Sequence, residues 1–367
     1  MNFMVLSDKI SSLQLDFASR CICDAQSIAI ITHQNPDGDA LGSSLGMRFF
    51  LLSLGKSNVA NIVPTSFPDF LAWMPGVDSV ITAEQQPELA TQTLRDADLV
   101  ICTDLAEATR VASMSSVLAE RFERAQQEEH KYSLLIIDHH LSSVYTSCPH
   151  QIAYPDSASA SELVFRLAYQ SGKLSLNEDF ATCIYTGMMT DTGNFSYNSC
   201  QPEMYSIVAM LLTTGINKDA IYDKVFNAYG VDRVRLMGYC LYHKMRIFPE
   251  YHTALITLNR REIYRFNAKS GDMEGIVNLP LQIKDIYYSV FMREDKVPPH
   301  QKQEAGSSTI KAKISFRSQG DRPVNIMARE VFNGGGHMNA SGGEFFGKVD
   351  QAAEKFAQVM PKYFLTE

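Results

Sequence analysis

The chain has 367 residues, of which 45% are hydrophobic and 20% charged, and its net charge is −8. The length suits two domains, and the acidic balance argues against a protein that coats long nucleic acid, which would need a basic stripe. We expect no membrane span and no secretory signal, and therefore a cytoplasmic protein. The seven cysteines include no CxxC pair, which favours plain thiols over disulfides or a zinc cage.

The first half of the chain alternates strand-like and helix-like segments. Strands are predicted at 27–32, 97–103 and 133–137, and helices at 41–54, 159–170 and 178–189. Asp39 or Ser43 is expected near the start of the first of these helices. This βαβ rhythm predicts an α/β domain built on a parallel sheet with helices on both faces.

The second half has a different character. The segment 218–245 is helix-like and reads as a connector, and strands are predicted at 252–258, 287–292 and 309–316. The polar segment 293–308 is interpreted as a solvated loop of open purpose. We therefore predict a smaller C-terminal α/β domain with a mixed sheet.

A group of side chains that commonly bind metals follows the first strand. His33, Asp37 and Asp39 have the spacing His-x3-Asp-x-Asp, and Pro36 and Gly38 between them allow the backbone to fold around a centre. A loop can direct both carboxylates inward, whereas a regular strand cannot. The alternative is a plain surface turn, because Pro-Asp-Gly is a common turn sequence.

Further polar residues follow other apolar segments. Asp104 comes after the second strand, where an ordinary N-cap or loop residue is the alternative. Asp138, His139 and His140 follow the third strand, and two adjacent histidines behind an aspartate are hard to explain as packing. Asp191 ends an apolar helix, where the helix dipole disfavours a carboxylate without a compensating cation. Ligands of open α/β sheets bind at the carboxyl edge of the strands, so we expect one common crevice.

The combined set of candidate metal ligands consists of His33, Asp37, Asp39, Asp104, His139 and Asp191. Mixed imidazole and carboxylate ligation favours Mn²⁺, with Fe, Co or Zn as alternatives and Mg²⁺ less suited. Six ligands suffice for two ions if one aspartate bridges them. Two ions roughly 3.5–4 Å apart form the usual clamp for in-line attack on phosphorus.

These segments resemble the motifs of the DHH phosphoesterase superfamily. The matches are HxxPDGDA at 33–40, an aspartate after the next strand, DHH at 138–140 and GxxxDTGxF at 187–195. The segment 334–343, GGGHMNASGG, resembles the signature of the DHH-associated C-terminal domain. Size and layout are most similar to the bacterial nanoRNase/pAp phosphatase group. The resemblance implies a DHH catalytic domain over 1–215, a helical linker over 216–235 and a DHH-associated substrate-binding domain over 236–367.

The resemblance also implies roles for individual residues. His33, Asp37 and Asp104 would bind one ion, and Asp39, Asp104, His139 and Asp191 the other, with Asp104 as the bridge. His140 would contact the scissile phosphate and protonate the leaving oxygen. Asp138 would orient a histidine.

A glycine segment supplies candidate substrate contacts. Gly334, Gly335 and Gly336 would bring backbone amides close to an anion, and His337 would add charge or a hydrogen bond. The alternative is a Gly-rich turn. By resemblance, Arg317 reaches the nucleotide, where a guanidinium suits a phosphate or a base plane.

Two lysines near Arg317, Lys311 and Lys313, could contribute to the grip on the terminal phosphate, but solvated surface residues are the favoured interpretation. Met338 departs from the family pattern, in which a basic residue often follows GGGH.

The implied activity is hydrolysis of short oligoribonucleotides to mononucleotides, and of 3′-phosphoadenosine 5′-phosphate, at two divalent ions, expected to be Mn²⁺. One alternative is a phosphodiesterase for cyclic di-AMP or linear dinucleotides on the same two domains. Another is a non-catalytic nucleotide-binding sensor with a structural metal. The expected partners are short oligonucleotides or nucleotides, with no long nucleic acid and no membrane. The oligomeric state stays open, with a homodimer as one option.

Overall fold

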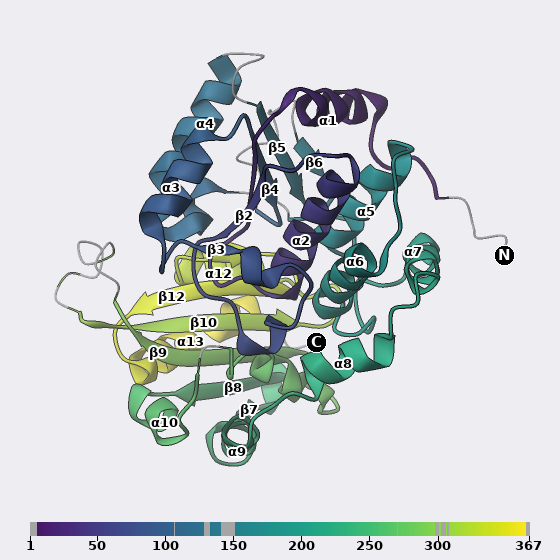
Figure 1. The fold of residues 1–367 in the computed structure, drawn as a ribbon. Helices are drawn as coiled ribbons and strands as arrows, with labels where there is room; N and C mark the ends of the chain where they lie inside the picture. Colours follow the sequence, from purple (N-terminus) through teal and green to yellow (C-terminus); the bar gives the residue numbers. More distant parts are fainter. Residues whose placement is uncertain are drawn as a thin grey trace. The chain divides into compact units, whose positions relative to one another are not determined.

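The computed structural model describes residues 6–105, 107–127, 133–140, 151–269, 271–297, 301, 306 and 308–364. The chain forms two compact units, Met1–Ala228 (unit 1) and Tyr229–Glu367 (unit 2), each with a six-stranded sheet (Figure 1). Among the described residues, no helix combines the length and the apolar character needed to cross a membrane.

All six strands of unit 1 run parallel, in the order β3-β2-β1-β4-β5-β6. They are β1 (Ile28–Ile31), β2 (Val59–Val63), β3 (Ile81–Thr82), β4 (Leu99–Thr103), β5 (Ser133–Asp138) and β6 (Gln151–Ala153). Strands β1 and β4 are buried at every position, which explains their uninterrupted apolar sequences. The predicted strands at 27–32, 97–103 and 133–137 are confirmed.

Helices cover both faces of this sheet (Figure 1). They are α1 (Ser12–Asp24), α2 (Gly38–Ser53), α3 (Pro87–Asp96), α4 (Ser115–Gln127), α5 (Ala160–Gln170), α6 (Glu178–Asp191), α7 (Pro202–Leu212) and α8 (Lys218–Phe226). Apolar residues of α1, α2, α5 and α6 share one core with the sheet, and those of α3 and α4 share the core on the other face. The predicted architecture of the N-terminal domain is therefore confirmed.

The start of α2 differs from the prediction. The helix begins at Gly38 and its N-cap is Asp37, whose Oδ1 accepts hydrogen bonds from the amides of Asp39 and Ala40, each 3.0 Å long. Asp39 therefore lies inside the first helical turn. Sequence periodicity missed this start because the first turn carries polar and glycine residues in place of apolar ones.

Helices α2 and α6 approach each other closely through glycine. A Cβ atom added to Gly42 would lie 2.6 Å from the Cys183 carbonyl oxygen and 2.8 Å from the backbone of Gly187. One helical turn on either side, Gly38 and Gly46 likewise have no room for a Cβ against side chains of α6. The spacing of four residues places all three glycines on one face of α2.

Unit 2 contains a mixed sheet in the order β11-β12-β10-β9-β8-β7, in which β8 and β9 are parallel and the other pairs antiparallel. Its strands are β7 (Arg246–Phe248), β8 (Thr253–Leu258), β9 (Tyr288–Lys296), β10 (Ile310–Ser318), β11 (Gly335–Gly336) and β12 (Ala340–Phe346). Its helices are α9 (Val231–Tyr239), α10 (Arg260–Arg265), α12 (Asn325–Val331) and α13 (Val349–Tyr363). The predicted C-terminal α/β fold with a mixed sheet is confirmed.

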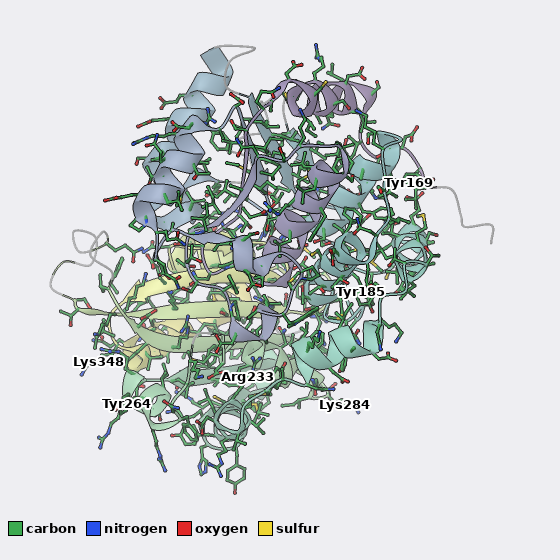
Figure 2. All side chains as sticks on the ribbon, viewed as in Figure 1. Tyr169, Tyr185, Arg233, Tyr264, Lys284 and Lys348 are labelled. Atoms are coloured by element: carbon green, nitrogen blue, oxygen red, sulfur yellow. The ribbon has the colours of Figure 1, made fainter. Side chains whose placement is uncertain are left out.

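The helical prediction over 218–245 is largely confirmed by α8, by α9 and by a π-helical turn over Cys240–Lys244, but the segment is interrupted between Phe226 and Val231. Arg233, labelled in Figure 2, belongs to α9. Its guanidinium is buried over the Tyr229 ring and donates to the Glu274 carbonyl, which anchors α9 within unit 2.

The loop predicted over 293–308 starts too early. Strand β9 continues to Lys296 because every residue from Arg293 onward pairs with β10. Residues 298–300, 302–305 and 307 of this segment lie outside the described residues.

The contact between α2 and α6 generates a stability prediction. Gly42→Ala places a methyl group against the backbone of α6, which cannot give way as a side chain can, so we expect a loss of roughly 1–3 kcal/mol in unfolding free energy. The control is Gly238→Ala, in the exposed part of α9, where a Cβ meets nothing within 4 Å and the better helix propensity of alanine is mildly stabilising. Thermal unfolding of both variants measures this effect. A Gly42→Ala variant with the unfolding temperature of the native protein would contradict the interpretation.

Candidate metal centre

The strand order of unit 1 gathers the polar motifs at one edge of the sheet. Strands β1, β4 and β5 are neighbours and parallel, so their carboxyl ends lie side by side. His33 follows β1, Asp104 follows β4, and Asp138 is the last residue of β5. Three motifs distant in the sequence therefore meet at the centre of the sheet.

His33 and Asp104 form a buried pair. The His33 Nε2 lies 3.1 Å from Asp104 Oδ2, and the His33 Nδ1 lies 2.8 Å from the carbonyl oxygen of Gln34. Because a carbonyl only accepts, Nδ1 carries a proton and Nε2 is the nitrogen available to an ion. Burial opposes the imidazolium, but the hydrogen bond to Asp104 and the charges of Asp104 and Asp37 raise the pKa of His33.

Asp104 occupies a strained position at the centre of the group. Its φ is +52°, a left-handed backbone conformation uncommon for a residue other than glycine, and its side chain is buried. Burial alone would raise its pKa, yet contacts with His139 and His33 and the charge of His140 hold the pKa of Asp104 well below its usual range.

Asp39 is held by the amino terminus of α5. Its two carboxylate oxygens accept from the amides of Ala160 and Ser161, at 2.7 and 2.9 Å. Burial, reinforced by the charge of Asp104, nevertheless raises the pKa of Asp39 to about 6. Asp39 therefore has a fixed orientation but an unfavourable charge in the protein alone.

His139 lies among three carboxylates. Its Nε2 is 3.4 Å from Asp191 Oδ2, 3.6 Å from Asp104 Oδ1 and 3.8 Å from Asp39 Oδ2. Burial lowers the pKa of His139, but the interaction with Asp104 and the charges of Asp191 and Asp39 outweigh it, so the pKa is well above its usual value.

Asp191, the last residue of α6, completes this group. Burial and the charges of neighbouring aspartates raise its pKa well above the usual value, although His139 opposes the shift. Gly187 makes the approach feasible, because a Cβ at this position would lie 1.9 Å from Ser161 Oγ and 2.8 Å from Asp39 Oδ1.

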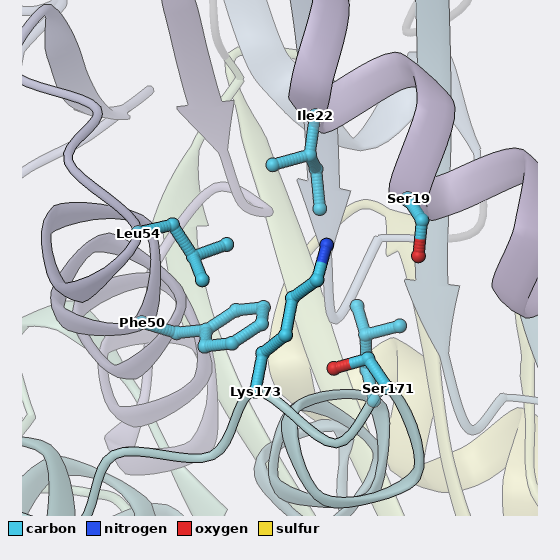
Figure 3. Close-up of a pocket in the computed structure, with 7 residues that line it drawn as sticks. Ser19, Ile22, Phe50, Leu54, Ser171 and Lys173 are labelled. Carbon is cyan, nitrogen blue, oxygen red and sulfur yellow. The ribbon is translucent and has the colours of Figure 1, made fainter.

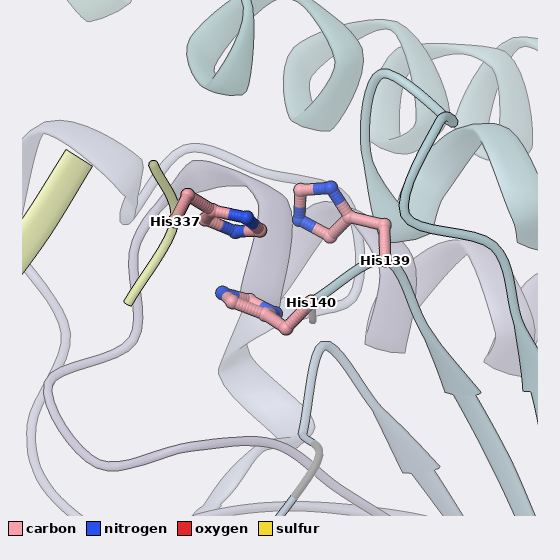
Figure 4. A group of neighbouring side chains, drawn as sticks. All are labelled: His139, His140 and His337. Atoms are coloured by element: carbon pink, nitrogen blue, oxygen red, sulfur yellow. The ribbon is translucent and has the colours of Figure 1, made fainter. Parts of the chain in front are cut away.

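Asp138 and His140 form a second carboxylate–imidazole pair. The His140 Nδ1 lies 2.8 Å from Asp138 Oδ1 and 3.3 Å from Asp104 Oδ1. Asp138 is fully buried, whereas the His140 side chain is 24% exposed. The rings of His139 and His140 are 4.7 Å apart and steeply inclined, as Figure 4 shows. Asp138 thus orients the one histidine of the pair that solvent reaches appreciably.

The grouping of ligand atoms fits divalent cations. One set consists of His33, Asp37 and Asp104, another of Asp39, His139 and Asp191, and a third of Asp104, Asp138 and His140, each with ligand atoms within 4.8 Å of one another. In addition, Asp104 Oδ1 and Asp138 Oδ2 are buried and accept no hydrogen bond within the described part of the chain. A buried carboxylate oxygen without a donor is unfavourable unless a cation meets it.

Two residues of the motifs to which the sequence assigned no role are structural. Asn35 has a positive φ, and its amide donates to Thr65 Oγ1. Thr192 is fully buried; its hydroxyl donates to the Met188 carbonyl and accepts from the Phe195 amide, which closes the end of α6. The amino terminus of α5, which holds Asp39, was missed. Its signal is Ser159, whose hydroxyl caps the helix at the Glu162 amide.

A small hollow elsewhere in unit 1 shows no comparable chemistry. It lies against the ends of α2 and α5, where Phe50, Leu54 and Ile22 line it and the Lys173 side chain crosses it (Figure 3). Its lining contains no carboxylate or imidazole.

The glycine segment of unit 2 is shaped by close backbone contacts. A Cβ at Gly334 would lie 1.9 Å from the Gly342 carbonyl oxygen, and Gly336 has a φ of +130°. The Gly334 amide donates to the Ala328 carbonyl, whereas a Cβ at Gly335 would meet nothing within 4 Å. Gly335 and Gly336 pair with β12, and the expectation of amides directed at an anion stays a prediction.

The two other candidate substrate residues also lie in unit 2. His337 follows β11, and its carbonyl accepts from the Ser341 hydroxyl at 2.7 Å. Arg317 lies on β10, and its Nη1 donates to the Phe316 carbonyl at 2.9 Å. Both side chains are half-buried.

Comparison with known proteins identifies the family. The model of the DHH family, N-terminal domain, matches residues 27–188. A crystal structure of an exopolyphosphatase-related protein from Bacteroides fragilis is 42% identical, covers 98% of each chain and has a TM-score of 0.85. The bifunctional oligoribonuclease and PAP phosphatase NrnA of Thermus thermophilus is 28% identical, over 91% of this chain and 89% of its own. The cyclic-di-AMP phosphodiesterase GdpP of Bacillus subtilis is 23% identical, over 94% of this chain and 49% of its own.

The matched region contains the six strands of unit 1 and all the candidate metal ligands except Asp191. The relatives extend the similarity over nearly the whole chain. The chain belongs to the DHH family.

Proposed function

We propose that this protein is a metal-dependent hydrolase that degrades short oligoribonucleotides to mononucleotides and removes a phosphate from 3′-phosphoadenosine 5′-phosphate. The observation that carries the proposal is the convergence of Asp39, Asp104 and Asp191 on His139, with buried carboxylate oxygen left unsatisfied at Asp104. The name of the T. thermophilus relative, an oligoribonuclease and PAP phosphatase, supports the substrate class.

We assign the metal ligands as two sets that share Asp104. His33, Asp37 and Asp104 would hold one divalent ion, and Asp39, Asp104, His139 and Asp191 the other. The mixed imidazole and carboxylate donors favour Mn²⁺. Bound there, two such ions would lower the pKa of a coordinated water and neutralise charge on the phosphoryl oxygens.

The protein's own side chains position the reacting groups. The α5 amides fix the Asp39 carboxylate, and the Gln34 carbonyl fixes the His33 ring, so both present a defined atom to an ion. Asp138 accepts from His140 Nδ1, which orients the ring. We propose that His140 contacts the scissile phosphate and donates a proton to the leaving oxygen.

We propose that unit 2 binds the parts of the substrate other than the scissile phosphate. We propose that Arg317, the segment Gly334–Gly336 and His337 contact a phosphate or base of the nucleotide. A guanidinium matches a phosphate in a bidentate way, and small residues let the chain approach an anion closely. We likewise assign the catalytic role to residues 1–215, the connecting role to 216–235 and the substrate-binding role to 236–367.

The compartment, the partners and the oligomeric state of the protein are also proposals. Cys23, Cys183, Cys200 and Cys240 form no disulfide with any described residue, which supports a reducing compartment such as the cytoplasm. The net charge of −8 argues against long nucleic acid as a partner. We leave a homodimer as the assembly to be tested by light scattering.

Removing the shared ligand tests the assignment. We expect Asp104→Asn to lower kcat on a 5′-phosphorylated diadenylate by at least about a hundredfold, because each ion loses a charged ligand. The matched control is Asp78→Asn, an exposed aspartate in the 3₁₀ turn Val77–Ser79, which should keep the native rate. Native activity in Asp104→Asn would refute the proposal.

Removing and restoring the metal tests whether a cation relieves the repulsion among the buried carboxylates. Mn²⁺ added to chelator-treated protein should raise the unfolding temperature, because the cation meets carboxylates that repel one another. The pKa of Asp39 is raised to about 6 in the protein alone, so below that pH a proton competes with the ion. Calorimetry should therefore show weaker Mn²⁺ binding and greater proton release as the pH falls from 7 to 5. Binding that does not change over this range would contradict the ligand assignment.

A substrate panel separates the proposed activity from its nearest rival. The GdpP relative makes cyclic di-AMP the alternative substrate. With Mn²⁺ present, we expect hydrolysis of linear diadenylate and of 3′-phosphoadenosine 5′-phosphate, with cyclic di-AMP at least about tenfold slower. Faster opening of the ring would favour the rival, and nucleotide binding without turnover would favour a sensor.

A further inference from the structure

Two cations face each other on the sheet of unit 2. Arg293 on β9 is the direct cross-strand partner of Lys313 on β10. Their neighbours Met292 and Ile314 point into the core beneath α12 and α13, so alternation places Arg293 and Lys313 on the opposite face. Like charges in directly opposed positions destabilise a sheet, and this pair is therefore costly for the fold.

The surrounding carboxylates neutralise this pair only in part. Asp295 Oδ2 lies 3.3 Å from Lys313 Nζ, and both side chains are about two-fifths exposed. Arg293 makes no ion pair or hydrogen bond with the described residues through its side chain. Glu294 is engaged elsewhere, because its carboxylate accepts from the amides of Arg260 and Val349.

The electrostatics of the pair agree with this geometry. Burial lowers the pKa of the Arg293 guanidinium. Burial and the charge of Arg293 lower the pKa of the Lys313 ammonium, although Asp295 opposes the shift. Both groups are therefore held where an additional anion would stabilise them.

Lys311, two residues earlier on the same face of β10, has a structural role with which Lys313 can be compared. It is buried, its Nζ lies 2.7 Å from Glu344 Oε2, and it also bonds to Gln301. The interpretation of Lys311 as a solvated surface residue is wrong, because this ion pair is built into the sheet. Lys313 lies directly opposite the same Glu344 in the pairing of β10 with β12, but that carboxylate bonds to Lys311, and Lys313 pairs with the half-exposed Asp295 instead.

The pair lies in line with a residue already assigned to the substrate. Lys313, Ser315 and Arg317 point to the same face of β10, and Lys313 is four residues from Arg317, about 13 Å along a strand. An oligonucleotide carries phosphates repeated along its length, so a row of cations along a strand matches successive phosphates.

We propose that Arg293 and Lys313 form a second anion subsite, which binds a phosphate of the oligonucleotide beyond the one assigned to Arg317 and the glycine segment. The inference rests on the proposed function and deepens it, because the subsite makes affinity depend on substrate length.

The test measures binding to metal-free protein, which cannot hydrolyse the probe. The probes are 5′-phosphorylated triadenylate, which carries several phosphates, and adenosine 5′-monophosphate, which carries one. We expect Lys313→Gln and Arg293→Gln to weaken triadenylate binding about tenfold each and to change monophosphate binding less than about twofold. The slope of log Kd against log salt for triadenylate should shrink by about one per removed charge.

Stability supplies the control against a merely structural role. Lys313→Gln relieves like-charge repulsion, so its unfolding temperature in phosphate-free buffer should equal or exceed that of the native protein. Lys311→Gln, the matched control, should lower the unfolding temperature because Glu344 loses its partner, while the ratio of the two affinities stays native. Unchanged triadenylate affinity in Lys313→Gln and Arg293→Gln, or equal losses for both probes, would overturn the subsite.

The outcomes also separate this inference from the proposed function. If the native protein with Mn²⁺ hydrolyses triadenylate but both variants bind it normally, the function stands and the subsite fails. If the variants lose triadenylate affinity but the native protein never cleaves it, the subsite stands and the proposed hydrolase fails. If the native metal-free protein binds neither probe, the measurement is made with Mn²⁺ and probes whose phosphorothioate linkages resist hydrolysis, and equal triadenylate affinities of the native protein and both variants there refute the subsite.

Discussion

The structure of unit 1 depends on a concentration of buried negative charge that the chain alone cannot stabilise. Asp39, Asp104 and Asp191 all approach His139 within 3.8 Å. Burial raises the pKa of Asp39 and Asp191, whereas histidine contacts hold the pKa of Asp104 low. Protons on histidines and carboxylates thus balance the cluster in the protein alone. Divalent cations would replace those protons and, unlike protons, would stay bound at neutral pH. Metal binding would therefore stabilise the folded protein.

A scaffold that holds such a cluster must be rigid where the ligands attach. Strands β1 and β4 lie in the middle of a parallel sheet and are buried on both faces, so His33 and Asp104 follow the least mobile backbone of the unit. Helices α2 and α6, which carry Asp39 and Asp191, meet through backbone atoms at Gly42 and Gly187. Backbone contact leaves no flexible side chain to absorb a shift. The distance between these two carboxylates is therefore set by the packing of the two helices.

Much of this arrangement follows from local sequence, and the remainder does not. Apolar runs ending in Asp or His predict parallel strands with polar ends, because each strand is buried on both faces. The contact of Asp39 with the α5 amides joins residues 121 and 122 positions apart, which no local pattern encodes. The glycines of α2 have low helix propensity, but they form the surface that packs against α6. Strand β9 was cut short because Arg293–Lys296 are charged, although cross-strand pairing decides their conformation.

An acidic protein that acts on a polyanion must separate the signs of its charge. On the proposed function, the carboxylates of unit 1 would hold cations that contact the reacting phosphate, so its acidity would not oppose the substrate once metal is bound. The remaining phosphates need protein cations, and these are useful only where carboxylates do not already neutralise them. Glu344 bonds to Lys311, whereas Asp295 is the carboxylate that forms an ion pair with Lys313 among the described residues. On the proposed function, affinity for the substrate would depend on cations that carboxylates neutralise only in part, and a net charge of −8 does not reveal them.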